Sequence, residues 1–225
     1  MPQASNHPFL IEYPYREVVG AYRAGAIRLY CHIRAHILRN RILREVGQYI
    51  PFAGRVTELG CGFGLFANCL AKSRSDCVFK GCDLNAGRIQ EASNVSKTLG
   101  IDNIEFHAGD AVAYVESMEE QDCIYMLDLV HHLPPDQVDR FINTSWKHLK
   151  PGGLLVIKDV SNKPYFKMAF TWILDVLMTR GEIPYYRSPE AFIELLSPLG
   201  GRIVVHYLDD YLPYPHVMYV VHKPL

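Results

Sequence analysis

Beyond Arg55, short β-rich runs alternate with segments of helical character. This alternation constrains the fold strongly, because strands joined through helices pair in parallel and have both faces of their sheet covered by those helices. The sequence therefore predicts an α/β fold with a mostly parallel sheet. Seven strands are expected, at residues 55–59, 77–83, 104–110, 122–130, 154–160, 202–208 and 216–223. Helices are expected at residues 65–73, 86–100, 111–117, 135–149 and near 189–196.

No helical segment separates the last two expected strands, so we expect the sheet to end in a C-terminal antiparallel hairpin. The length of 225 residues suits one domain with an embellishment. We expect residues 55–225 to form this domain and residues 1–54 to form an N-terminal helical cap or lid segment. A lid-like helical insertion is expected near residues 161–188.

The composition argues against several classes of protein. Apolar residues make up 49% of the chain and charged residues 21%, as in an ordinary globular protein, and the net charge of −1 gives no general attraction to nucleic acid. The six cysteines form neither a CxxC pair nor a zinc-binding spacing. Neither a signal-peptide pattern nor an apolar run of about 20 residues is present. We therefore expect a reduced, cytoplasmic protein.

A glycine-rich turn, "VTELGCGFG" at residues 56–64, links the first expected strand to the first expected helix. Glycine lets the backbone turn tightly and lets a ligand approach the main chain, and the following helix N-terminus supplies free N–H groups. Ligands of open α/β sheets bind at this carboxyl edge. The spacing G-x-G-x-G differs from the dinucleotide fingerprint G-x-G-x-x-G, because Leu65 occupies the sixth position.

The stretch "ELGCGFG" resembles the first motif of class I S-adenosylmethionine-dependent methyltransferases, and "GCD", "GDA" and "LKPGGLLVIKD" follow in the order typical of that family. The resemblance covers roughly residues 55–225. It implies a Rossmann-like class I methyltransferase fold, with a seven-stranded, mostly parallel sheet. It also implies S-adenosyl-L-methionine as cofactor and S-adenosyl-L-homocysteine as product.

The resemblance also implies roles for three acids. Glu58 would lie near the methionyl amine, Asp83 would accept the ribose hydroxyls, and Asp110 would accept from the adenine amino group. The expected cofactor contacts are Glu58, Gly60, Cys61, Gly62, Gly64, Asp83, Leu84, Asp110, Ala111 and Leu127. Simpler interpretations stay open. Glu58 could be a strand-end acid bound to a helix N-terminus, and Asp83 and Asp110 could be helix N-caps. Cys61 could be a small packing residue.

The candidate catalytic residues lie at the ends of the fourth and fifth strands. Asp128, His131 and His132 occur in "LDLVHHLP", and Asp159 ends the fifth strand. One histidine, with His131 preferred, would act as general base, because imidazole titrates near neutral pH. Alternatively D-x-x-H-H supplies metal ligands, resembling the cluster of quinone-pathway O-methyltransferases that use a divalent cation, or the histidines are structural. Asp159 would contact the substrate or cap a loop.

The expected acceptor is a small molecule. The strand-four motif of enzymes that methylate adenine or glutamine nitrogen is not present, and Cys123 lies inside an expected strand rather than at a catalytic position. A helix at residues 165–178 would carry a broad apolar face, suited to a substrate lid, a sheet cover or a homodimer contact. We expect O-methylation of a lipid, quinone-type or polyketide-like hydroxyl. C- or N-methylation and a non-catalytic cofactor-binding scaffold or accessory subunit are the alternatives.

The N-terminal segment is basic, since residues 16–55 hold eight arginines and two acids. On one continuous helix, four of the arginines would nearly align: Arg16, Arg23, Arg34 and Arg41. Gly20 and Gly25 would break such a helix. A solvated basic face is the simplest interpretation, and contact with an anionic membrane or an acidic substrate is the alternative. Tyr13 and Tyr15 are candidates for a lid over the cofactor.

Overall fold

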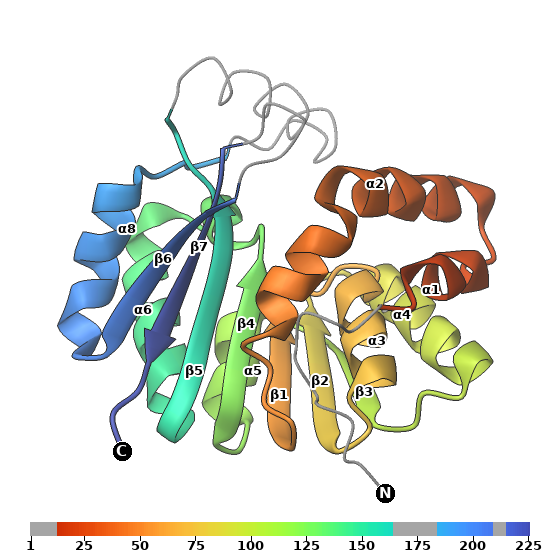
Figure 1. Cartoon of the computed structure of the whole chain (residues 1–225), viewed down its shortest axis with the longest axis horizontal. Coiled ribbons are helices and arrows are strands. Elements are labelled where there is room, and N and C mark those ends of the chain that lie inside the picture. The colour runs from red at the N-terminus through yellow and green to blue at the C-terminus, as the bar shows by residue number, and fades with distance from the viewer. Residues whose placement is uncertain (1–12, 164–183, 209–214) are drawn as a thin grey trace, which may run out of the picture.

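The computed structural model describes residues 13–163, 184–208 and 215–225, apart from the side chains of residues 35–41. The described strands form one seven-stranded sheet in the order β3-β2-β1-β4-β5-β7-β6 (Figure 1). The first five strands pair in parallel, and β7 is antiparallel to both of its neighbours. The predicted fold class is thereby confirmed. The strands are β1 (Gly54–Leu59), β2 (Cys77–Asp83), β3 (Ile104–Ala108), β4 (Gln121–Leu127), β5 (Leu149–Val160), β6 (Arg202–Leu208) and β7 (His216–His222).

Helices cover both faces of the sheet and bury a separate apolar cluster on each. The first face carries α1 (Tyr15–Ala21), α2 (Gly25–Gly47), α3 (Leu65–Ser73) and α4 (Ala86–Leu99). The second face carries α5 (Ala111–Ser117), α6 (Pro135–Lys147) and α8 (Pro189–Leu196). In β4, Tyr125 joins the first cluster and Met126 the second, as the period of two in a strand requires. Because both faces are covered, β4 is almost continuously buried.

Two strand boundaries differ from those predicted by three residues or more, and one of them shapes the site. The fourth strand ends at Leu127 rather than at residue 130, because Asp128 has a positive φ of 55° and turns the chain out of the sheet. A short 3₁₀ turn, η2 (Val130–His132), follows. The fifth strand begins at Leu149, earlier than expected, because the "KPGG" segment continues the ladder with a register shift opposite β4.

The N-terminal segment forms two helices rather than one. The chain leaves the helical conformation between Ala21 and Gly25, as the two glycines suggested. The predicted alignment of four arginines therefore does not arise: Arg16 lies in α1 and Arg23 in the connection, while Arg34 points inward to the sheet edge. Far from this segment, a short 3₁₀ turn, η3 (Ser197–Leu199), follows α8.

The N-terminal helices are integrated into the first core. Val18, Val19 and Tyr22 are buried in it, and α1 packs on α3. The proposed lid or dimer-contact helix at residues 165–178 lies outside the described residues and stays a prediction. Among the described residues, no helix is long and apolar enough to cross a membrane.

Candidate functional site

The glycine-rich turn is tied to β2 and leaves one face open. The Gly60 and Cys61 N–H groups both donate to the Cys82 carbonyl, at 2.8 and 2.9 Å. All three glycines of the turn have positive φ. A Cβ on Gly60 would lie 2.7 Å from the Leu129 side chain, whereas a Cβ on Gly62 would meet no atom within 4 Å. Gly60 is therefore required by protein packing, and Gly62 borders open space that a ligand can approach.

Asp83 lies beside this open face, at the end of β2. Its Oδ2 accepts from the Gly62 N–H at 2.9 Å and its Oδ1 accepts from the Asn85 N–H at 2.9 Å. The N-cap of α4 is Asn85, whose side chain accepts from the Arg88 N–H. The alternative interpretation of Asp83 as the N-cap is therefore wrong, and its half-buried carboxylate keeps two of roughly four acceptor positions.

Glu58 is buried at the end of β1, with an exposed fraction of 2%. It accepts a hydrogen bond from the Tyr125 hydroxyl at 3.0 Å and one from the backbone N–H of Ala67 in the first turn of α3. Burial raises the pKa of Glu58 to about 8, although these hydrogen bonds and nearby Arg34 act in the opposite direction. The helix N-terminus interpretation thus describes Glu58 in this structure. Its raised pKa favours the protonated carboxyl group near neutral pH, so a cationic ligand beside it would displace that proton.

The remaining expected cofactor residues differ in their surroundings. Asp110 is exposed and caps α5, accepting from the Ala113 N–H at 2.9 Å, as the simpler interpretation held. Cys61 is buried, and burial raises the pKa of its thiol, so it is a packing residue rather than a nucleophile. Leu127 is buried and Ala111 is half-buried. Leu84 is 77% exposed, which leaves a large apolar side chain uncovered beside Asp83.

Two cations hold Asp128 at the end of β4. The Lys158 Nζ donates to its Oδ1 at 2.5 Å, and the Arg34 Nη2 lies 3.3 Å from its Oδ2. Burial opposes the charge, but Lys158 and Arg34 outweigh this effect and hold the pKa of Asp128 well below its usual range. Burial lowers the pKa of Lys158. Asp128 is thus an ionised carboxylate within an ion-pair network that joins α2, β4 and β5.

This network disfavours the metal interpretation of Asp128, His131 and His132. Two positive side chains already neutralise the only carboxylate among the three and would repel a divalent ion. Within residues 13–163, 184–208 and 215–225, no cluster of three or more His, Cys, Asp or Glu side chains is suitable for holding a metal.

His131 is fixed by Asp159 across the gap between η2 and β5. The carboxylate of Asp159 accepts from the His131 backbone N–H at 3.0 Å and makes a close contact with its ring Nδ1. Both side chains are buried, with exposed fractions of 2% and 1%. Asp159 also accepts from the Val160 N–H at 2.8 Å. Asp159 therefore orients the imidazole.

His132 stacks obliquely on His131, with ring centroids 4.1 Å apart. Burial, and then the neighbouring His131 ring, lower the pKa of His132 to about 4. His132 is therefore neutral at physiological pH and a weak base. Tyr186, in the segment that precedes α8, lies beside His131, with ring centroids 5.4 Å apart. The N–H of the neighbouring Tyr185 donates to the His131 carbonyl at 2.7 Å.

Three contacts to these residues were not predicted from the sequence. Arg34 reaches Asp128 from 94 positions away, Tyr125 binds Glu58, and the Tyr22 hydroxyl donates to the Phe63 carbonyl in the glycine-rich turn at 2.7 Å. Tyr30 contacts the turn as well, because its ring packs edge-on against the Phe63 ring with centroids 5.4 Å apart. Of the two tyrosines expected to cover the cofactor, Tyr13 is buried against Gly47. Arg34 is one of eight arginines in its segment, and no local pattern distinguishes it from the others.

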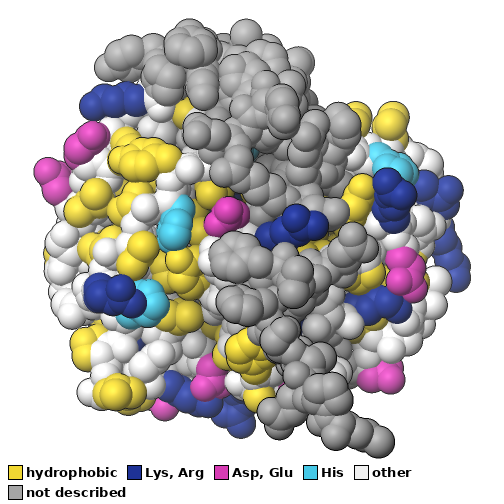
Figure 2. Space-filling model, viewed as in Figure 1, with side chains coloured by type: hydrophobic (Ala, Val, Ile, Leu, Met, Phe, Trp, Pro, Cys, Tyr) yellow, Lys and Arg dark blue, Asp and Glu magenta, His cyan; other side chains and the backbone are white. Residues whose placement is uncertain are grey.

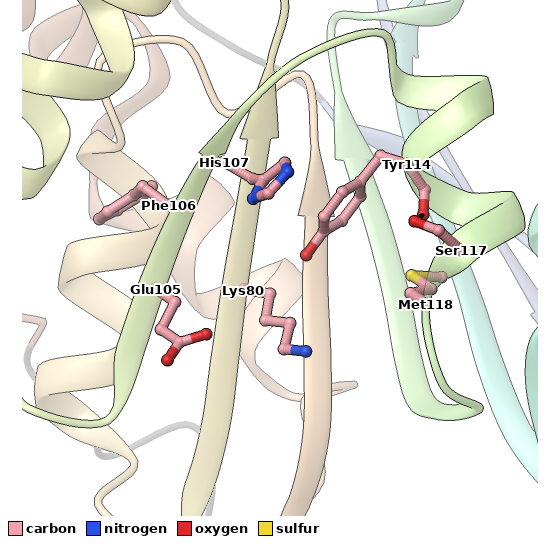
Figure 3. Close-up of a pocket in the computed structure, with 7 residues that line it drawn as sticks. All are labelled: Lys80, Glu105, Phe106, His107, Tyr114, Ser117 and Met118. Atoms are coloured by element: carbon pink, nitrogen blue, oxygen red, sulfur yellow. Dashed lines mark hydrogen bonds between the residues drawn. The ribbon is translucent and has the colours of Figure 1, made fainter.

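A separate hollow of about 450 Å³ lies on the second face, between β2, β3 and α5 (Figure 3). The rings of His107 and Tyr114 point toward each other across it, with centroids 5.0 Å apart. None of the predicted site residues lines this hollow. Its lining consists of Lys80, Glu105, Phe106, His107, Tyr114, Ser117 and Met118.

Comparison with known sequences agrees with this geometry. Residues 56–153 match the family described as a methyltransferase domain. A ubiquinone biosynthesis O-methyltransferase from Agrobacterium fabrum is 30% identical over 128 residues, which is 55% of this chain and 49% of that protein. A protein of the same name from Coxiella burnetii is 28% identical over 127 residues, 56% of this chain and 52% of that one. The chain thus spans about half the length of the curated relatives it matches.

Solved structures show the same fold. An O-methyltransferase family protein from Burkholderia thailandensis superposes with a TM-score of 0.70 at 15% identity, covering 89% of this chain and 60% of that one. The magnesium protoporphyrin IX methyltransferase of Synechocystis, with bound S-adenosylhomocysteine, has a TM-score of 0.65 at 14% identity, covering 93% and 92%. Residues 56–153 are thus similar to a methyltransferase domain, and they lie within a fold that this chain shares with these solved methyltransferases.

Proposed function

We propose that this chain transfers the methyl group of S-adenosylmethionine to a hydroxyl group of a small, hydrophobic acceptor. One observation carries the choice of a hydroxyl: the imidazole of His131 is held by the Asp159 carboxylate at the carboxyl edge of the sheet. The glycine-rich turn after β1 lies at the same edge, one strand away from β4. A hydroxyl nucleophile benefits from such a base, because its proton must leave as the carbon–oxygen bond forms.

The cofactor would lie over the open side of Gly62. Asp83 would accept the ribose hydroxyls with its two remaining acceptor positions, and Glu58 would lie near the methionyl ammonium. S-adenosylmethionine supplies an electrophilic methyl carbon on a sulfonium, so the chain's main task is to hold the acceptor oxygen in line with it. Leu84, exposed beside Asp83, offers an apolar surface for the adenine. Asp110 and Ala111 would lie at the adenine edge.

On the acceptor side, Asp159 would fix the tautomer of His131. With Nδ1 bound to the carboxylate, Nε2 is the ring nitrogen that accepts the hydroxyl proton. Asp128, ionised between Lys158 and Arg34, would fix the start of the turn that carries both histidines. His132 would line the acceptor side as a neutral ring. The curated relatives that match this chain are named O-methyltransferases, which agrees with a hydroxyl acceptor.

A methyl-transfer screen tests the proposal. The protein is incubated with S-adenosylmethionine labelled in its methyl group and with matched phenols, catechols, anilines and long-chain alcohols, and the labelled products are separated. Labelled phenols or alcohols support the proposal, and labelled anilines alone would favour N-methylation. Tight calorimetric binding of the cofactor with no labelled product from any acceptor class would favour the non-catalytic scaffold.

We expect Asp83→Ala to weaken S-adenosylmethionine binding at least about tenfold while the fold stays intact. The variant loses the hydrogen bonds to the ribose, and each hydrogen bond to a charged group contributes roughly 1.5–3 kcal/mol. Isothermal titration calorimetry measures the affinity, and Asp102→Ala, at an exposed aspartate near the start of β3, is the matched control. Unchanged affinity in Asp83→Ala would mean that the ribose binds elsewhere.

Cofactor affinity should rise with pH below about pH 8, because the pKa of Glu58 is raised to about 8 in the ligand-free protein. At lower pH the carboxyl group is protonated, and binding a methionyl ammonium beside it must release that proton. The affinity should therefore increase by up to about tenfold per pH unit between roughly pH 6 and 7.5. Calorimetry in buffers of different ionisation enthalpy measures the released proton. Glu58→Gln should release none, and equal proton release by both proteins would contradict the assignment.

A further inference from the structure

The N-terminal helices carry a strong local excess of positive charge. Residues 18–44 contain six arginines and no aspartate or glutamate, in a chain whose net charge is −1. Figure 2 shows dark blue side chains gathered with a histidine on the right of the molecule, where Figure 1 places α1 and α2. Such a concentration of one sign attracts an anionic surface over distances near the Debye length, about 8 Å at physiological salt.

Two large aliphatic side chains are exposed among those that the structure describes in this basic region. Leu29 is 61% exposed and Ile33 is 48% exposed. They are four positions apart on α2, so they lie one turn apart on the same side of the helix. Arg28 and His32, each directly before one of them, are exposed as well, and so is Arg23 at the entry to α2. The outer face of α2, defined here by these five residues, thus combines positive charge with uncovered aliphatic surface.

Contacts on the inner face of α2 hold the helix, and with it the outer face, in place. Cys31, Ile42 and Val46 are buried in the first core, and the helix packs on α1 and α3. Arg34 pairs with Asp128 at the carboxyl edge of the sheet. The guanidinium of Arg28 donates to the Tyr22 carbonyl at 2.9 and 2.6 Å, which ties the entry of α2 to the end of α1. The outer face is therefore presented rigidly.

We propose that the outer face of α2 docks on an anionic lipid surface. Arginine binds phosphate groups through paired N–H donors, and the Leu29 and Ile33 side chains would insert at the boundary between headgroups and acyl chains. The contrast in charge between this face and the rest of the chain favours a negatively charged bilayer over a neutral one. Docking would bring Arg34 and the edge of the site within about one helix diameter, roughly 10–12 Å, of the lipid surface. The docking itself is independent of the proposed function. Only its use, which is to bring the site close to a hydrophobic acceptor in the membrane, rests on the proposed function.

Vesicle flotation tests the docking without any activity measurement. The full chain is mixed with phosphatidylcholine vesicles that contain or lack phosphatidylglycerol and is centrifuged through a density gradient. It should float with the anionic vesicles, stay behind with the neutral ones, and be released at high salt. Arg23→Glu should weaken binding at least about fivefold, since each basic residue near such a surface contributes about that factor. The double change Leu29→Ser with Ile33→Ser should also reduce flotation.

Matched controls test whether binding depends on the outer face of α2 or on charged and apolar side chains anywhere on the surface. Lys97→Glu changes the charge equally on exposed α4, and Tyr207→Ser removes a 66% exposed aromatic from the edge strand β6. Both should float like the unaltered protein, and all variants should melt at its temperature, because the changed side chains are exposed. Flotation unchanged in the α2 variants, or binding to heparin without binding to anionic vesicles, would overturn the proposal. Methyl transfer to a water-soluble acceptor should be unaffected by the Leu29 and Ile33 changes, so failure of docking is distinguishable from failure of the proposed function.

Discussion

Replacing His131 by alanine should lower turnover by about 10²–10⁴-fold, the range typical of a lost general base. The variant removes the imidazole that Asp159 holds at the end of β5 while leaving the glycine-rich turn untouched. Cofactor affinity should therefore stay close to that of the unaltered protein. Single-turnover methyl transfer to the best acceptor of the screen, combined with calorimetry of cofactor binding, measures both quantities.

The pH profile distinguishes a base from a structural histidine. Turnover by the unaltered protein should fall at low pH as the ring of His131 is protonated, and the residual activity of His131→Ala should lose this limb. Asp159→Asn should reduce turnover too, because the amide no longer favours the tautomer that leaves Nε2 as acceptor. His148→Ala, at a histidine that contacts the Thr144 carbonyl in α6, is the matched control.

Two outcomes would contradict the assignment of His131. Turnover that is unchanged both in His131→Ala and in the presence of a chelator would make both histidines structural and leave proximity as the source of catalysis. Loss of activity with a chelator, restored by a divalent ion, would favour the metal interpretation, against the two cations that hold Asp128.

The cofactor side of the site could be predicted from the sequence because its geometry is local. The glycine-rich turn joins a strand directly to a helix, so its residues are positioned by their own neighbours along the chain. Asp83 is placed by the end of the next strand in the sheet, and parallel pairing brings it to the Gly62 N–H. Which acid caps which helix was less predictable. Asn85 rather than Asp83 caps α4, because the chain needs two more residues after β2 before the helix begins.

The acceptor side depends on contacts between distant parts of the chain. A left-handed residue at position 128 ends β4 early, and a non-glycine residue in that conformation has no reliable sequence signature. The Arg34–Asp128 pair spans 94 positions and forms only because α2 lies over the sheet edge. Burial then decides the chemistry: the pKa of Glu58 rises to about 8, whereas that of Asp128 falls, and both carboxylates end parallel strands. The difference comes from Lys158 and Arg34, which both form ion pairs with Asp128.

Lys158→Met should destabilise the fold by about 3–5 kcal/mol, the cost typical of removing one partner of a buried ion pair. The Lys158 side chain is fully buried and Asp128 is 15% exposed, so water cannot replace the lost ammonium well. Arg34, 30% exposed and 3.3 Å away, compensates only in part. The melting temperature should fall by roughly 6–20 °C, measured by circular dichroism. Lys150→Met, which breaks the more exposed pair with Asp122, should cost less than about 1 kcal/mol.

A double variant shows whether the loss comes from the stranded charge or from the altered packing. Adding Asp128→Asn to Lys158→Met removes the unpaired carboxylate while keeping a residue that tolerates positive φ. Most of the lost stability should return, because methionine fills a volume similar to that of lysine and no buried anion is left. If the double variant melts as low as Lys158→Met alone, the lysine stabilises the fold through its packing. The ion pair would then not be what holds the start of the histidine turn.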